Sequence, residues 1–362
     1  NHHVTATASL GFTMNVTGVA QNIVFGATHA TAFGQMTLKA PIEMRAREGV
    51  NIDSSLKVEA GTAEDAIFTV VAVDGSVDMD TGANGWILVE SPCDWRAQDN
   101  IKMHSKTSIK FTSTKQDTFR ASDGNLSVAT NSGAIEVQSL TNWYAGQDIS
   151  FKALDITFQG GDGSWLEANT GALVLATNIH DTSCLDGKIT IQVPATWNAG
   201  ARVEVNTAKL STTVNGSTAQ EFNVATQGPS LIHTCSSSQQ GGGTSTFGSK
   251  TRWTGDHDIH FMQHSVVANE GTGFDMTSNQ RAIILDSESV HNRWLNLTAP
   301  ATLKAAEGGV AITNFSMHVL AHSTEDDQPF TIEVTAADND IAMTGSGGDR
   351  VFVHSPFNWT AF

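Results

Sequence analysis

Apolar and polar residues alternate over most of the chain, in short segments that are separated by Gly, Asn, Asp and Ser. Ile101 with Met103, Ile149 with Phe151 and Val203 with Val205 are typical pairs. A period of two residues places successive side chains on opposite faces of a β-strand, and the polar breaks between segments are typical of turns. The pattern therefore predicts many short strands, each with one inward and one outward face. No window predicts a long amphipathic helix.

A short motif recurs along the whole chain at intervals of about 50 residues. It reads S-P-C-D-W-R-A at 91–97, S-L-T-N-W-Y-A at 139–145 and S-P-F-N-W-T-A at 355–361. Its fifth position always holds a bulky apolar residue: Met44, Trp95, Trp143, Trp197, Trp253, Leu303 and Trp359. Repetition of this kind is typical of stacked coils. We therefore predict an all-β β-solenoid of about six repeats, with two three-sided coils per repeat or, alternatively, one larger flattened coil.

The repeat also predicts how the chain is organised. Residues 1–33 match the second half of a preceding repeat, and a continuous β-solenoid is expected over 34–362. The expected repeats are 34–84, 85–133, 134–187, 188–245, 246–294 and 295–349, followed by the start of the next. Neither end shows a recognisable cap, so we expect sheet edges that pair with more of the same protein or with another copy.

The side chains that should fill the core follow from the alignment of the repeats. We expect Trp to stack above Trp and Phe above Phe, with one strand of each repeat led by Phe68, Phe119, Phe222, Phe274 or Phe330. Leu154 and Ile156 form one of the expected inward pairs. A small residue follows each Trp on the same side of the strand, which favours core packing over an outward platform for sugar stacking.

Charge restricts the partners of the chain. It carries 37 acidic and 20 basic residues, for a net charge of −17. Binding of nucleic acid or of an anionic membrane needs a basic face, so we expect neither. Apolar runs such as 68–73 are far shorter than a membrane span. Contact with a membrane is expected only through a partner or a segment outside this sequence.

Cysteines and sequons bear on the compartment of the protein. Cys184 and Cys235 lie near the same corner of successive repeats, so they are a possible disulfide pair, whereas Cys93 replaces a small or apolar residue and should be a packed thiol. Six asparagines form N-glycosylation sequons: Asn15, Asn125, Asn215, Asn296, Asn314 and Asn358. Three of these, at 125, 296 and 358, stand beside inward residues, so strand alternation should turn them outward. An extracellular or cell-surface location is expected.

The repeats resemble the extracellular repeat of the sarcoglycans. The resemblance rests on A-P-I-E-M-R-A-R-E-G-V-N-I-D at 40–53, on S-P-C-D-W-R-A-Q-D-N-I-K-M-H at 91–104, and on F-R-A-S-D-G-N-L-S-V at 119–128. It implies a β-helical ectodomain with a scaffolding role and no enzyme activity. This chain departs from the family pattern because it has no transmembrane helix, no terminal cysteine cluster and more repeats. Membrane anchoring and the partners of that family are therefore not carried over.

Candidate chemistry is sparse. His257, His260 and His264 could bind a transition metal, but in a strand 257 lies opposite the other two, so an outward polar face is the favoured interpretation. We find no nucleophile elbow, phosphate-binding loop or zinc motif, and we expect no catalytic residue, metal or cofactor. A pair of carboxylates for polysaccharide cleavage is not singled out by the sequence.

These observations predict a structural, non-catalytic protein of an extracellular filament, sheath or surface appendage. Its expected partners are other copies of itself or neighbouring structural proteins, joined through ends and corner loops such as 181–187 and 235–245. An adhesin or viral spike that binds carbohydrate or a receptor is the alternative, and a β-helical enzyme acting on polysaccharides is the third hypothesis.

Overall fold

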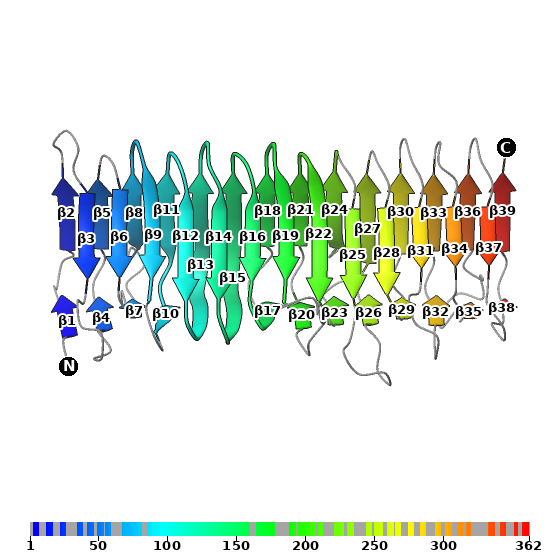
Figure 1. Cartoon of the computed structure of the whole chain (residues 1–362), viewed down its shortest axis with the longest axis horizontal. Coiled ribbons are helices and arrows are strands. Elements are labelled where there is room, and N and C mark those ends of the chain that lie inside the picture. Colours follow the sequence, from blue (N-terminus) through cyan, green and yellow to red (C-terminus); the bar gives the residue numbers. More distant parts are fainter. Residues whose placement is uncertain are drawn as a thin grey trace. The chain divides into compact units, whose positions relative to one another are not determined.

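A computed structural model describes the chain mainly at its strands. The described residues are 3–6, 12–16, 22–26, 35–38, 42–46, 49–53, 55–58, 67–81, 85–159, 164–177, 188–192, 195–207, 209–212, 221–227, 230–234, 244–247, 250–255, 259–263, 265–268, 274–278, 283–286, 294–297, 301–305, 310–313, 316–319, 332–336, 341–344, 351–353 and 357–361. Every element among them is a β-strand, and the strands stack in parallel (Figure 1), so the predicted β-solenoid is confirmed. The chain divides into two compact units, Asn1–Gly171 and Ala172–Phe362. The continuity expected over 34–362 stays a prediction.

In unit 1 (Asn1–Gly171), each coil has three sides, here called A, B and C. Side A holds β1 (His3–Ala6), β4 (Gln35–Leu38), β7 (Ser55–Val58), β10 (Trp86–Val89) and β17 (Asp155–Phe158). Side B holds β2 (Phe12–Val16), β5 (Ile42–Ala46), β8 (Phe68–Ala72), β11 (Cys93–Ala97) and β18 (Ser164–Ala168). Two long strands, β13 (Ser108–Ala121) and β15 (Ala134–Ala145), run through both A and B. Side C holds β3 (Asn22–Gly26), β6 (Gly49–Asp53), β9 (Ser76–Asp80), β12 (Ile101–Ser105), β14 (Leu126–Thr130) and β16 (Ile149–Lys152).

Unit 2 (Ala172–Phe362) is built from the same three-strand coil. Side A holds β20 (Lys188–Ile191), β23 (Lys209–Thr212), β26 (Thr244–Phe247), β29 (Ser265–Ala268), β32 (Trp294–Leu297), β35 (Ser316–Val319) and β38 (Val351–Val353). Side B holds β21 (Ala195–Ala199), β24 (Glu221–Thr226), β27 (Lys250–Gly255), β30 (Phe274–Ser278), β33 (Ala301–Ala305), β36 (Ile332–Ala336) and β39 (Phe357–Ala361). Side C holds β19 (Ala172–Ala176), β22 (Arg202–Thr207), β25 (Ser230–Thr234), β28 (Ile259–Gln263), β31 (Ile283–Asp286), β34 (Val310–Thr313) and β37 (Ile341–Thr344).

The strand registers show two coils in each sequence repeat. Trp95 on β11 pairs with Phe119 on β13, and Phe119 pairs in turn with Trp143 on β15. The bulky residue of the motif therefore returns after two coils, not after one. This spacing confirms two three-sided coils per repeat and removes the alternative of one flattened coil.

One line of inward side chains on side B, here called the tryptophan column, runs through each unit. In unit 1 it contains Met44, Val70, Trp95, Phe119, Trp143 and Leu166. In unit 2 it contains Trp197, Val224, Trp253, Met276, Leu303 and Val334. None of these side chains is more than 2% exposed. We expected Trp to stack directly above Trp. Instead, a different apolar residue occupies the coil between two tryptophans, as Phe119 does between Trp95 and Trp143.

A second inward line on side B, here called the second column, lies two residues before the tryptophan column. In unit 1 it contains Phe68, Cys93, Asp117, Thr141 and Ser164. Phe119 was expected to align with Phe68, but its register places it in the tryptophan column, so Asp117 takes the place of the phenylalanine. The pairing of β13 with β15 shifts between Thr112 and Gln116, and after this shift Asp117 lies level with Thr141 and Phe119 lies level with Trp143.

Corners between the strands are tight where coils approach closely. A Cβ atom added to Gly133 would lie 1.4 Å from the carbonyl oxygen of Thr107 in the preceding coil, so this position excludes every larger residue. Leu154, expected to point inward, lies at a corner directly before β17 and is 41% exposed. The inward residues of that strand are Ile156 and Phe158, both buried.

Candidate functional site

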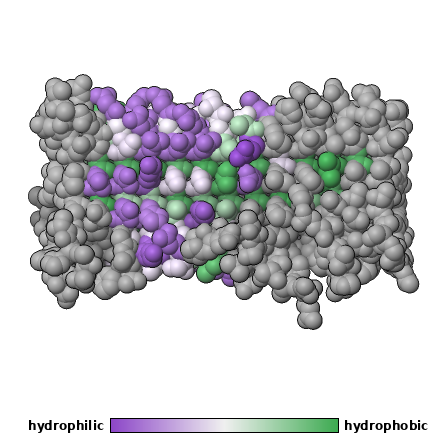
Figure 2. All heavy atoms as spheres, in the orientation of Figure 1, coloured by the Kyte–Doolittle hydropathy of each residue, from purple (hydrophilic) through white to green (hydrophobic). Residues whose placement is uncertain are grey.

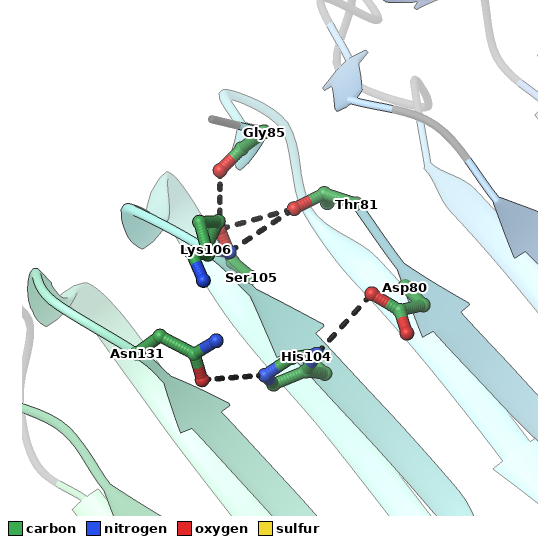
Figure 3. Close-up of polar contacts among 7 residues, drawn as sticks. All are labelled: Asp80, Thr81, Gly85, His104, Ser105, Lys106 and Asn131. Carbon is green, nitrogen blue, oxygen red and sulfur yellow. Dashed lines mark hydrogen bonds and ion pairs between the residues drawn. The ribbon is translucent and has the colours of Figure 1, made fainter. Parts of the chain in front are cut away.

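His104 is the centre of a polar cluster that links three successive coils on side C (Figure 3). Its Nδ1 lies 3.2 Å from Oδ1 of Asp80, which ends β9, and its Nε2 lies 2.8 Å from Oδ1 of Asn131, which follows β14. The strands place these side chains in line because β12 pairs with β9 on one side and with β14 on the other. Each coil therefore contributes one member of the cluster.

The pair of His104 and Asp80 has the geometry in which a carboxylate orients a catalytic imidazole. A nucleophile would have to lie at Nε2, but that nitrogen contacts the side chain of Asn131. A ring flanked by two oxygens donates to both only when it carries both protons; with one proton, the Asn131 amide must be turned over to donate. The arrangement therefore acts as a clamp between coils and does not complete a catalytic triad.

The hydroxyl groups nearest to His104 also join coils. Ser105 Oγ donates to the carbonyl oxygen of Gly85 at 2.8 Å, and Thr81 Oγ1 lies 3.4 Å from Ser105 Oγ (Figure 3). The backbone N–H of Lys106 donates to Thr81 Oγ1 at 3.3 Å. Ser105 is fully buried and Thr81 is 3% exposed, so neither hydroxyl is presented to a substrate in solution.

Asp117 is a carboxyl group buried inside the tube. Its Oδ1 accepts a hydrogen bond from the backbone N–H of Cys93 at 3.0 Å, and its Oδ2 accepts one from Ser139 Oγ at 2.5 Å. The Asp117 side chain is fully buried and Cys93 is 1% exposed. The carboxyl group therefore bonds to residues of both neighbouring coils inside the tube.

Burial shifts the pKa of both groups in this pair. Desolvation raises the pKa of Asp117 from its usual 3.8, and the hydrogen bond from Ser139 partly opposes this rise. The pKa of the Cys93 thiol is raised well above 9.0, first by desolvation and then by the nearby charge of Asp117. A thiol with a raised pKa stays protonated at neutral pH and is a poor nucleophile. The predicted assignment of Cys93 as a packed thiol agrees with this environment.

A ladder of side chains ties the corner before side C from coil to coil. The Oγ of Ser76 accepts from the N–H of Asn100, Oδ1 of Asn100 accepts from the N–H of Asn125, and Oδ1 of Asn125 accepts from the N–H of Asp148. Asn125 is half-buried within this ladder. Its Oδ1 caps the next coil, and its glycosylation stays a prediction.

The outward face of side B in unit 1 carries aromatic and charged side chains. Arg96 forms two bonds to Asp94 on the same strand, Nε to Oδ1 at 2.9 Å and an Nη to Oδ2 at 2.6 Å. One coil further, the guanidinium of Arg120 lies 5.0 Å from the ring centre of Tyr144 on β15. This face was not predicted as a site, because its residues sit at the outward positions between the motif residues that defined the repeat.

Trp165 continues this outward face on β18. Its side chain is 45% exposed, and its Nε1 donates to Oε2 of Glu167 at 3.2 Å. It differs from the tryptophans of the motif, which are all buried where their side chains are described. Alternation along the strand gives the reason, because Leu166 takes the inward position in the tryptophan column.

The remaining candidate residues fall partly outside the described residues. Met44, Trp95, Trp143, Trp197, Trp253 and Leu303 lie in the tryptophan column, and Trp359 on β39 is in register with Val334 of that column. Asn15, Asn296 and Asn358 lie on β2, β32 and β39, while Asn215 and Asn314 lie outside the described residues. Cys184, Cys235, His257 and His264 also lie outside them. His260 lies on β28, in register with Leu231 and Ile284.

No protein-family model, curated protein or solved structure matches this chain. Within the described part of the chain, no group of His, Cys, Asp and Glu is arranged to hold a metal ion. The same part contains no helix long and apolar enough to cross a membrane. In the described part of unit 1, the face in Figure 2 presents hydrophilic side chains with rows of hydrophobic residues between them. Asp78, Lys102 and His104 lie at outward positions of side C.

Proposed function

We propose that the protein is a structural, non-catalytic component of an extracellular filament, sheath or surface appendage, with other copies or neighbouring structural proteins as its partners. A solenoid is suited to this role because each coil contacts only its neighbours, so the stack can extend in one dimension without changing its core. Its flat parallel sheets present repeated surfaces to which a second protein can bind.

The unbroken tryptophan column within each unit is the observation that carries this proposal. An unbroken column lets each coil stack on the next with the same kind of core, which suits a protein built by repetition. In this column every position whose side chain the structure describes is filled by a buried apolar residue. The sequence has therefore kept the stack regular at its centre.

The polar clusters support the same role. His104 and Asp117 each bond to residues of neighbouring coils, and the ladder at Asn100 and Asn125 joins corner to corner. These groups stabilise the stacking of coils, since a buried polar group that lacked such partners would destabilise it. Their hydrogen-bonding groups are used to join one coil to the next.

Negative-stain electron microscopy and sedimentation of the purified chain test the proposal. We expect elongated particles that lengthen or associate as concentration rises. Added salt should favour association, because it screens the repulsion between copies of net charge −17. Compact particles that stay monomeric at every concentration and ionic strength would contradict the proposal.

An adhesin that binds carbohydrate is the second candidate, and Trp165 favours it. An exposed indole ring on a flat sheet is the kind of residue that dominates the energy of binding interfaces. The two functions are compatible, because a filament can carry a binding face on one of its sides.

A further inference from the structure

We propose that side B of unit 1 carries a binding surface for a neutral, linear polysaccharide, formed by the outward side chains of β11, β13, β15 and β18. This inference goes beyond the scaffold function and does not depend on assembly into filaments. It rests on the arrangement of two outward rows of side chains, here called the outer rows.

The outer rows follow from the strand registers. One row contains Asp94, Thr118, Asn142 and Trp165, and the other contains Arg96, Arg120, Tyr144 and Glu167. Neighbouring strands lie roughly 4.8 Å apart, close to the length of one sugar ring in an extended polysaccharide. A polymer that runs across the strands therefore meets a new pair of side chains at each coil, in step with its own repeat.

The residue types of the outer rows suit a polymer of sugar rings. Trp165 presents an exposed aromatic face, and Trp, Tyr and Arg are the residues that contribute most at interfaces. The amide of Asn142, the hydroxyl of Thr118 and the carboxylates supply donors and acceptors for sugar hydroxyl groups. Flat aromatic rings and mixed hydrogen-bonding groups are both needed, because a sugar ring has apolar C–H faces and a polar rim.

The side chains of the outer rows are already held in place. Asp94 holds Arg96 through two hydrogen bonds, Arg120 lies against the ring of Tyr144, and Glu167 accepts from the indole N–H of Trp165. Such contacts reduce the side-chain entropy that is lost when a ligand binds. The surface is therefore organised before the polysaccharide arrives.

The charge of the outer rows and of the whole chain favours a neutral polysaccharide over an acidic one. The two arginines of the outer rows are balanced by two carboxylates, Asp94 and Glu167, so the rows have no net formal charge. The whole chain carries −17 and repels polyanions. A basic face, which recognition of an acidic polysaccharide would need, is not present in these rows.

Affinity electrophoresis of the 362-residue chain against soluble linear polysaccharides tests the proposal. The probes are β-1,4-glucan, β-1,3-glucan and mannan as neutral polymers, with a polyuronate and a sulfated glycan as acidic ones. We expect binding to at least one neutral polymer and a loss of about tenfold or more in affinity for Trp165→Ala. Trp165→Phe keeps an aromatic face and should retain most of the affinity.

Trp86→Ala is the matched control, because Trp86 is an outward tryptophan on β10, which lies on side A. Circular dichroism of each variant checks that the strands are intact. Retained binding in Trp86→Ala together with loss in Trp165→Ala supports the proposal. It is overturned by binding to no neutral polymer, by binding to acidic polymers alone, or by equal losses in both variants. Imaging of filaments is independent of all these results.

Discussion

The tryptophan column and the second column of unit 1 lie two residues apart on the same strands, yet they fill the tube in opposite ways. The first is apolar in every coil, whereas the second changes from Phe68 and Cys93 to the polar residues Asp117, Thr141 and Ser164. All of these side chains are no more than 5% exposed. Two neighbouring columns with the same degree of burial thus hold different kinds of side chain, apolar in one and partly polar in the other.

Hydrogen bonding between coils explains the difference. Thr141 Oγ1 lies 3.1 Å from Ser164 Oγ, and Asp117 bonds to the coils on both sides, so the polar members of the second column are satisfied. In the tryptophan column, the indole N–H groups of Trp95 and Trp143 have no hydrogen-bond partner. Their rings instead contact other aromatic rings, as Trp95 does with Phe119 at 5.3 Å. In this column the stabilisation from aromatic packing exceeds the cost of leaving the indole N–H groups unpaired.

Truncation of Trp143 should have the largest effect. The ring stacks on Phe119 of the preceding coil at 3.9 Å and meets Phe151 of its own coil edge-on at 5.0 Å, so Trp143→Ala leaves a large cavity beside both rings. We expect the free energy of unfolding to fall by about 3–5 kcal/mol, measured by denaturant titration.

Trp143→Phe is the control for this variant. It leaves a smaller cavity and removes the unpaired N–H, so the loss should be only about 1 kcal/mol. If both variants lose the same free energy, the column is not held by aromatic packing.

The sequence predicts the tryptophan column but not the second column. The recurring motif marks one position in each repeat. Because inward positions are spaced by two residues, that position also predicts which residues of the strand point inward. Asp117 could not be placed in this way, since an acidic residue in a strand is usually outward. Its position depends on the irregularity between Thr112 and Gln116, which also moves Phe119 by two residues. Nothing in the local pattern indicates that shift.

Replacement of Asp117 should have an intermediate effect. Asp117→Ala removes the acceptor of both the Cys93 N–H and the Ser139 hydroxyl, so we expect a loss of about 1–3 kcal/mol in the free energy of unfolding. Asp117→Asn keeps an acceptor oxygen and nearly the same shape, and it should lose less. A loss in Asp117→Ala no larger than in Asp117→Asn would show that the polar column is not held by these bonds.

The pH dependence of the free energy of unfolding, compared between Asp117→Asn and the wild type, tests the burial of this carboxyl group further. Because burial raises the pKa of Asp117 above 3.8, the folded state binds the proton more tightly than the unfolded state. Its contribution to stability is fully present below the unfolded pKa and is lost as pH rises through the folded pKa. Asp117→Asn should therefore gain stability relative to wild type as pH rises from about 3.8, by at most about 1.4 kcal/mol per pH unit. The opposite trend would mean that the carboxylate is stabilised by its partners.

The outward faces were predicted only in part. Strand alternation indicates which residues point outward, but not which of them contact each other, because the coil length varies between neighbouring strands. Trp95 and Phe119 are 24 residues apart in number, whereas Val224 and Trp253 are 29 apart, as the differences 119 − 95 and 253 − 224 give. The contact of Arg120 with Tyr144 and the cluster around His104 depend on these lengths. Both emerge only from the three-dimensional register.

The clamp at His104 should have the smallest effect, and it extends the comparison from the inside of the tube to its surface. His104 joins three coils as Asp117 does, but its side chain is 41% exposed and that of Asp80 is 56% exposed, so water competes for the same bonds. We expect His104→Ala to lose no more than about 1 kcal/mol in the free energy of unfolding. A double-mutant cycle with Asp80→Ala isolates the pair, and its coupling should be a few tenths of a kcal/mol. A coupling as large as the loss at Asp117 would mean that bonds between coils, and not burial, decide the strength of each polar column.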